Sequence, residues 1–195
     1  MKTQELRKIV ETLKPAFKLN DIAEFGKYIV FANNLVFVYN GSMAIVMNYE
    51  SEQEFVVPAD EFSKFINRVK SKEITIDITN TIDIKAGHAK ASFSLNTDML
   101  TNAKSLQIEI PDTFDDLPED FTKALKLCQY SVGKDKSYEN LTYMYVHDNI
   151  MASTDNFRVS EYMMDSAMKD MMIPNESIKY LIQFNVDKYH LKEGT

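Results

Sequence analysis

Cysteine, histidine and glycine are scarce in this sequence. A single cysteine among 195 residues excludes an internal disulfide bond and suits a reducing compartment, so we expect a cytoplasmic protein. The three histidines, His88, His147 and His190, lie far apart, and no CxxC, HxxxH or HExxH spacing gives support for a metal site. The five glycines are scattered, which excludes a glycine-rich phosphate-binding loop. We therefore expect neither a metal nor a cofactor.

Long hydrophobic runs are also missing. No apolar stretch approaches the roughly 20 residues that span a bilayer, and the first residues are too polar for a secretion signal. We expect no membrane association. The net charge of −7 argues against general nucleic-acid affinity, but a protein can gather positive charge on one surface and carry acid elsewhere.

Catalytic motifs are weak. Asp155 with His147 or His88 would need a serine nucleophile, and no serine stands in a nucleophile-elbow context. Cys128 lies on an apolar helix face, which indicates a buried, inert thiol. We do not expect an enzyme.

The first part of the chain alternates helical and strand patterns. Residues 3–14 form a predicted helix whose apolar stripe is Leu6, Ile9, Val10 and Leu13. Pro58 opens a second predicted helix, with acidic residues in its first turn. Runs typical of strands occupy the following segments: 28–31, 35–39, 43–47, 55–57, 74–78, 81–85, 90–95 and 106–110.

This order of elements then restarts. Phe121 opens a helical stripe at an offset of 115 residues from Leu6 (121 − 6), and Ile173-Pro174 follows Val57-Pro58 at an offset of 116 (174 − 58). Repeated landmarks at one offset indicate a duplicated domain. The sequence thus predicts an α+β fold in which each copy packs two helices on antiparallel sheets.

The predicted boundaries are domain 1 at 1–110, an acidic connector at 111–120 and domain 2 at 121–195. A plain surface loop is equally compatible with the composition of 111–120. Only 21 residues follow Pro174 (195 − 174), so we expect a truncated second copy and favour a fragment of a longer chain.

Basic residues recur on the polar sides of the predicted helices and beside them, while the strands and the connector hold much of the acid. If the helices share one side of each sheet, that side can follow phosphates without reading bases. A solvated lysine-rich face is the ordinary alternative. The candidate DNA-facing residues are Lys2, Arg7, Lys8, Lys14, Lys18, Lys64, Arg68, Lys70, Lys123, Lys126 and Lys179.

Five methionines lie close together between positions 163 and 172. Flexible methionine side chains suit adaptable binding surfaces. We favour a packing role for this group, whose members are Met163, Met164, Met168, Met171 and Met172.

Three stretches, together with the order of elements, resemble the bacterial DNA sliding clamp, the β subunit of DNA polymerase III, and its phage relatives. The most specific is Ala152-Ser153-Thr154-Asp155-Asn156-Phe157-Arg158-Val159, which is similar to the family motif Ala-Thr-Asp-Gly-His-Arg-Leu. The others are 55–59 and 85–95. The resemblance implies a homo-oligomeric ring around double-stranded DNA, a dimer of three-domain chains when full length. It also implies partners, a DNA polymerase and a clamp loader.

The resemblance further implies a pocket for a partner peptide at Thr154, Asn156, Phe157, Arg158, Val159, Pro174 and Ile178. Two departures affect this pocket, because Asn156 stands for a glycine and Phe157 for a histidine. Phe93 matches a position near the ring-closing interface, although a strand core residue is the plain alternative. The competing hypothesis for the whole chain is a duplicated α+β protein-binding module that never encircles DNA.

Overall fold

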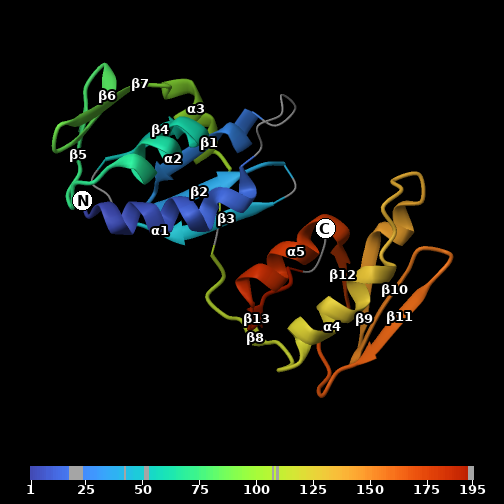
Figure 1. Ribbon diagram of the computed structural model, residues 1–195. Helices are drawn as coiled ribbons and strands as arrows, with labels where there is room; N and C mark the ends of the chain where they lie inside the picture. The colour runs from blue at the N-terminus through green and yellow to red at the C-terminus, as the bar shows by residue number, and fades with distance from the viewer. Residues whose placement is uncertain (18–23, 42, 51–52, 107, 109, 193–195) are drawn as a thin grey trace. The chain divides into compact units, whose positions relative to one another are not determined.

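The computed structural model describes residues 1–17, 24–41, 43–50, 53–106, 108 and 110–192 (Figure 1). The chain divides into two compact units, Met1–Ile108 and Glu109–Thr195. Within the described residues, no helix is long and apolar enough to cross a membrane.

The first unit has two antiparallel sheets. The first sheet has the strand order β3-β2-β1-β4, and the second has the order β5-β6-β7. The strands are β1 (Tyr28–Ala32), β2 (Leu35–Tyr39), β3 (Ala44–Asn48), β4 (Phe55–Pro58), β5 (Thr75–Ile78), β6 (Thr81–Ala86) and β7 (Ala89–Ser94). The helices are α1 (Thr3–Leu13), α2 (Ala59–Arg68) and α3 (Thr97–Lys104), with short 3-10 turns at Lys14–Ala16 and Glu24–Lys27.

The helices α1 and α2 lie side by side (Figure 1). Their apolar stripes, with Leu6 and Phe62 at the centre, are fully buried in the core of the first unit. The facing side chains of the first sheet include Phe31, which stacks on Phe55 at 4.4 Å between ring centroids and meets Phe62 edge-on. The residues that the helical period and the strand alternation predict to face the core are therefore the ones that the structure buries.

The opposite face of the first sheet is covered by α3. Asn96 caps this helix by accepting a hydrogen bond from the N–H of Met99 at 2.9 Å. Met99 and Ala103 are buried against Val30 and Val56 of the sheet. The sequence patterns did not predict α3, and its eight residues form only a short helix. The strand predicted at 106–110 is wrong for its described residues 106, 108 and 110, which lie in no strand.

The second unit repeats this design. The helix α4 (Phe121–Cys128) corresponds to α1, and α5 (Asn175–Phe184) corresponds to α2. One four-stranded sheet has the order β11-β10-β9-β12, the same topology as β3-β2-β1-β4. Its strands are β9 (Tyr143–His147), β10 (Ile150–Thr154), β11 (Val159–Met163) and β12 (Met171–Pro174), and 3-10 turns lie at Gln129–Ser131 and Glu139–Thr142.

The equivalence holds strand by strand. The strands β1, β2 and β3 begin 115 residues before β9, β10 and β11, and β4 begins 116 residues before β12. The predicted duplicated α+β fold is therefore confirmed. A counterpart of the β5-β6-β7 sheet is absent from the described part of the second unit, as a partial second copy requires.

The acidic segment 111–120 enters the fold of the second unit. Its residues Asp115–Asp116 form β8, which pairs with β13 (Lys188–Tyr189). Lys169 reaches the same strand through an ion pair with Asp115 at 2.6 Å. This part of the predicted connector is thus held by a strand from the end of the chain.

Candidate partner cavity and basic helix faces

The β10–β11 hairpin turn is built around Asp155. One oxygen of its carboxylate accepts the backbone N–H of Phe157 at 3.1 Å and of Arg158 at 2.8 Å. The other oxygen accepts two hydrogen bonds from the Arg158 guanidinium, at 3.1 Å from Nε and 2.6 Å from Nη2. Thr154 adds a third constraint, because its hydroxyl donates to the Arg158 carbonyl at 2.9 Å. These bonds fix the orientation of both Arg158 and the turn.

Asn156 adopts a left-handed backbone conformation, with φ of 72°. Residues with a Cβ atom pay a steric cost in this region, and asparagine pays less than most. Asn156 is therefore suited to a position that most residues with a side chain would strain. The next side chain, Phe157, is 94% exposed.

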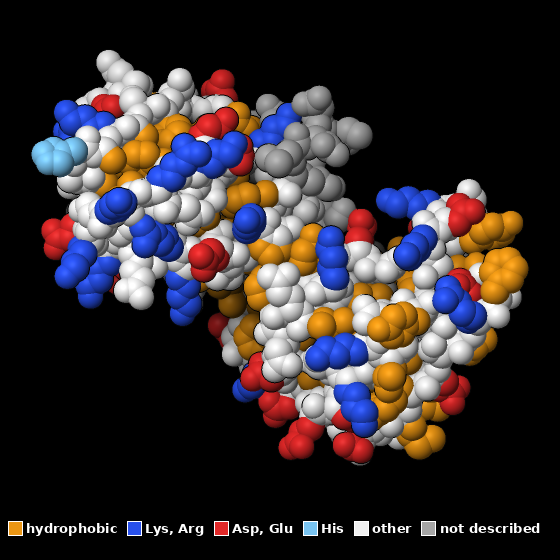
Figure 2. All heavy atoms as spheres, viewed as in Figure 1, with side chains coloured by type: hydrophobic (Ala, Val, Ile, Leu, Met, Phe, Trp, Pro, Cys, Tyr) orange, Lys and Arg blue, Asp and Glu red, His pale blue; other side chains and the backbone are white. Residues whose placement is uncertain are grey.

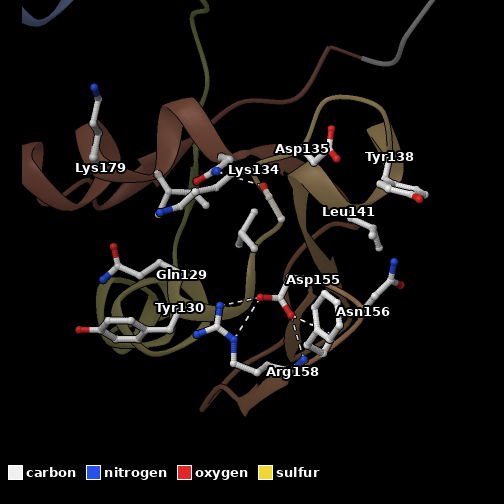
Figure 3. A pocket seen from close by; sticks show the side chains of 15 residues that line it. Gln129, Tyr130, Lys134, Asp135, Tyr138, Leu141, Asp155, Asn156, Arg158 and Lys179 are labelled. Atoms are coloured by element: carbon white, nitrogen blue, oxygen red, sulfur yellow. Dashed lines mark hydrogen bonds and ion pairs between the residues drawn. The ribbon is translucent and has the colours of Figure 1, made fainter.

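A cavity of about 760 Å³ lies beside this turn (Figure 3). Its walls come from the 3-10 turn that follows α4, the loop after that turn, the hairpin turn and the first half of α5. The lining residues are Gln129, Tyr130, Val132, Gly133, Lys134, Asp135, Tyr138, Leu141, Asp155, Asn156, Phe157, Arg158, Asn175, Ile178 and Lys179.

The loop wall of the cavity is held by close backbone contacts. The N–H of Gly133 donates to the Leu141 carbonyl at 2.8 Å. A Cβ at position 133 would stand 2.9 Å from that carbonyl oxygen, so the close approach requires glycine. The Asn175 side chain then donates to the Gly133 carbonyl at 3.2 Å and connects the loop to the start of α5. Contacts between packed segments therefore hold this wall of the cavity in place.

Four of the seven residues predicted for the partner pocket line this cavity. They are Asn156, Phe157, Arg158 and Ile178. Thr154 and Val159 do not line it. The Thr154 hydroxyl stabilises the turn through its hydrogen bond to the Arg158 carbonyl, and Val159 is 76% exposed on β11. Pro174 instead lines a neighbouring hollow of about 480 Å³ with Lys134 and Lys136.

Sequence reasoning missed the loop wall. Tyr130 and Tyr138 are 69% and 59% exposed and line the cavity together with Phe157. Exposed aromatic side chains offer large contact areas to a partner. The signal that could have found this wall was a pair of tyrosines among lysines after the third predicted helix.

The cavity is lined by both carboxylates and basic side chains, whose opposite charges partly cancel. The Arg158 hydrogen bonds lower the pKa of Asp155 below its ordinary value of 3.8. The Ser137 backbone N–H, a hydrogen-bond donor at 2.9 Å, lowers the pKa of Asp135 in the same direction. Both carboxylates are therefore ionised at neutral pH, beside Lys134 and Lys179.

In the first unit, candidate DNA-facing residues lie around α1 and α2, where Figure 2 shows Lys and Arg side chains spread over both helices. One hollow is lined by Lys2, Arg7, Lys8, Lys70 and Lys72, together with three glutamates. A second is lined by Lys14, Lys64 and Arg68, with a single acidic residue, Asp60, which pairs with Lys64. Lys18 lies outside the described residues.

Arg7 differs from the other basic residues. Its guanidinium donates to the carbonyls of Ile66, at 3.3 Å, and of Val69, at the end of α2. These carbonyls carry the negative end of the helix dipole. Arg7 therefore joins α1 to α2, and Lys8 beside it is exposed to solvent.

In the second unit, Lys123 and Lys126 are exposed on α4 and Lys179 is exposed on α5. Lys123 lies over the ring of Tyr162 at 5.4 Å, and Lys179 lies over Tyr180 at 4.5 Å. A hydrogen bond with Tyr162 raises the pKa of Lys123. In Figure 2 the basic side chains over α4 and α5 alternate with hydrophobic ones.

The remaining candidates have ordinary surroundings. Phe93 of β7 is half-buried and packs against Phe62 at 6.3 Å between ring centroids. Cys128 is fully buried, and its thiol donates to the Met151 carbonyl at 3.4 Å. Among the described residues, no cluster of three or more histidines, cysteines and acids could hold a metal ion.

Comparisons with known proteins connect this fold to a family. No family model matches the sequence, and no curated protein matches it. Many solved structures do match, and the sliding clamps described below share only 13–15% of their residues with this chain. The DNA polymerase β subunit of Streptococcus pyogenes superimposes with a TM-score of 0.79 and 14% identity, over 96% of this chain and 57% of that one.

Two further sliding clamps are similar. The clamp of Bartonella birtlesii, solved bound to griselimycin, has a TM-score of 0.75 and 13% identity, over 96% of this chain and 57% of its own. The clamp of Bacillus subtilis has a TM-score of 0.72 and 15% identity, over 94% of this chain and 55% of its own. This chain spans a little over half the length of these proteins, and it has the fold of the DNA polymerase III β subunit sliding clamps.

Proposed function

We propose that this chain is a subunit of a DNA sliding clamp, a non-enzymatic processivity factor of the cytoplasm. In this proposal it forms a homo-oligomeric ring around duplex DNA, is placed there by a clamp loader, and holds a replicative DNA polymerase. The single observation that carries the proposal is the duplicated clamp fold, in which each unit presents a pair of helices with exposed basic side chains.

The helix faces suit contacts with a phosphate backbone. Lys8 is exposed on α1, Arg68 at the end of α2 and Lys126 on α4. Contacts from lysine and arginine to phosphates are independent of base sequence and easily exchanged, which allows a protein to slide. Acidic residues elsewhere in the chain give it a net charge of −7, which weakens nonspecific binding of its other surfaces to nucleic acid.

The cavity suits the tethering of a partner through a short peptide. Phe157, Tyr130 and Tyr138 offer exposed aromatic surface around it, and Arg158 is already oriented by Asp155. Preorganised aromatic and arginine side chains are typical of residues that dominate binding energy. A polymerase held by such a peptide remains near the template at a high effective concentration.

Replacing Lys8, Arg68 and Lys126 together by alanine tests the binding of DNA. We expect weaker binding to duplex DNA and a slope of log K against log salt that is reduced by about 0.9 for each phosphate that the variant no longer neutralises. The matched control replaces Lys85, Lys90 and Lys192, which lie outside the helices, by alanine. Equal slopes for both triple variants would contradict the proposal.

Particle shape and polymerase processivity test the ring itself. Electron microscopy of the protein on DNA should show closed rings, and polymerase product length should fall in the triple variant. A protein that binds polymerase peptides with little salt dependence and never forms rings is instead the duplicated protein-binding module.

A further inference from the structure

The outer face of the β11-β10-β9-β12 sheet carries an apolar surface that no other described element buries. This outer apolar face consists of Tyr145, Ile150, Ala152, Met163 and Met172. Glu161, on the same side of the edge strand β11, lies opposite Ala152 and separates Val159 from this face. These side chains alternate along their strands with the buried ones of the core, such as Met144 and Met151.

The strand register makes this face continuous. Met163 lies opposite Ile150, Ala152 lies opposite Tyr145, and Tyr145 lies opposite Met172. Met163 and Met172 are 67% and 57% exposed. Contiguous exposed apolar side chains of this kind mark interaction sites.

The first unit shows what covers the equivalent face. Tyr145 and Ala152 correspond to Val30 and Phe37, 115 residues earlier, and Met172 corresponds to Val56, 116 residues earlier. All three residues of the first unit are buried, under Met99 and Ala103 of α3 and the partly buried Leu100, Leu106 and Ile108. A short amphipathic helix can therefore pack on the outer face of a sheet with this strand order.

An acidic residue at the same position of each unit supports this equivalence. Glu54, which precedes β4, accepts the N–H of Asn33 at 2.9 Å, and its other oxygen pairs with Lys104 at the end of α3. Asp170, 116 residues later, accepts the N–H of Asp148 at 3.0 Å. Its other oxygen lies 2.7 Å from Nδ1 of His147, in the place where the first unit holds the cation of the covering helix.

We propose that the outer apolar face of the second unit is the docking surface for an amphipathic helix of a partner protein. The helix presents methionine-, leucine- and alanine-sized side chains to Tyr145, Met163 and Met172. A basic residue near its C-terminal end pairs with Asp170 in place of His147. The unbranched methionine side chains adapt to the apolar stripe of the incoming helix. This docking is independent of DNA encirclement and of the cavity beside Asp155.

The test uses the full chain with ¹³C-labelled methionine methyl groups and a synthetic peptide of residues 96–108 of this protein. A lactam between Asp98 and a lysine introduced by Asn102→Lys stabilises its helix on the exposed side. We expect the Met163 and Met172 methyl signals to shift on titration, with a Kd below about 1 mM. The Met99 signal, from the covered face of the first unit, should stay unchanged.

Two variants of the chain sharpen the test. Met163→Gln with Met172→Gln should weaken peptide binding about tenfold or more, while thermal melting shows that the fold is kept. Asp170→Asn should weaken binding less and reduce its salt dependence. The control peptide carries Met99→Gln, Leu100→Gln and Ala103→Gln and should not bind.

Three results would overturn the proposal. The first is the absence of methyl shifts at about 1 mM peptide, or equal shifts with the control peptide. The second is a concentration-dependent shift without peptide together with a dimer in sedimentation, which would make a second copy the occupant. The third is protection of both methyl groups from a soluble paramagnetic reagent before peptide is added, which would mean that the same chain already covers the face.

Discussion

The carboxylate of Asp155 lies 2.6 Å from Nη2 of Arg158, and its second oxygen accepts the backbone N–H of the same arginine at 2.8 Å. One side chain thus fixes both the backbone and the guanidinium of its partner. The Arg158 side chain remains 64% exposed although it is held in place, whereas Asp155 is 16% exposed. This relationship connects the folding of a hairpin turn to the shape of the cavity beside it.

Asp155→Asn should destabilise the protein at neutral pH. The pKa of Asp155 is lowered, chiefly by its hydrogen bond with Arg158, so its ionised form favours the folded state. That contribution is present above the ordinary pKa of 3.8 and is lost as pH falls through the lowered pKa. Denaturant unfolding from pH 2 to pH 7 should show wild type and variant converging at the acid end. Asp112→Asn, at an exposed position, is the control and should show a smaller difference at neutral pH.

Position 156 should tolerate glycine and reject a branched side chain. Asn156→Val places a β-branched residue at φ of 72° and should cost about 1–2 kcal/mol of unfolding free energy. Asn156→Gly should stay within about 0.5 kcal/mol of wild type. Phe157→Val, at an adjacent exposed position without positive φ, controls for β-branching in the turn. Equal losses for both valine variants would show that the left-handed conformation is unimportant.

Arg7→Ala should destabilise the first unit by about 1–3 kcal/mol, because charged hydrogen bonds to the end of α2 are lost. Arg7→Lys should recover only part of this loss, since an ammonium group cannot reproduce the guanidinium fork. Chemical denaturation measures both effects. Lys8→Ala, at the next and exposed position, should change the unfolding free energy by no more than about 0.5 kcal/mol.

The Cys128 thiol should be nearly unreactive in the folded protein. Burial raises its pKa from 9.0 to about 11, which lowers the thiolate fraction near pH 8 about 100-fold. Iodoacetamide should therefore alkylate the native protein at least about 100-fold more slowly than the denatured protein. The raised pKa also means that stability falls as pH rises from 9 toward 11. Cys128→Ala should reduce this fall, and an unchanged pH dependence would contradict the assignment.

Much of the fold could be predicted because local patterns and tertiary burial agree. Leu6, Ile9, Val10 and Leu13 were predicted as one stripe of a helix, and all four are buried. Pro58 was predicted to open a helix, and both Pro58 and its predicted counterpart Pro174 directly precede one, α2 and α5. The offset of 115 to 116 residues in the sequence is the offset between equivalent strands.

The candidate site was predicted less well. Asn156, Phe157 and Arg158 line the cavity because the hairpin turn that carries them has a local sequence signature. Tyr130, Lys134 and Tyr138 line it from a loop whose path depends on contacts far along the chain, such as Gly133 with Leu141 and Asn175. Such contacts leave no periodic trace in a sequence.

The sequence by itself determined the period of each helix, the alternation of each strand and the duplication, because these depend on neighbouring residues and on which side chains avoid water. Only the tertiary structure decided which surfaces are covered. It placed α3 over the outer face of one sheet and left the equivalent face of the second unit's sheet without a covering helix among the described residues, and it bound Arg7 to carbonyls 59 and 62 residues away. Those outcomes depend on segments distant in sequence meeting in space, which the pattern of any one segment does not encode.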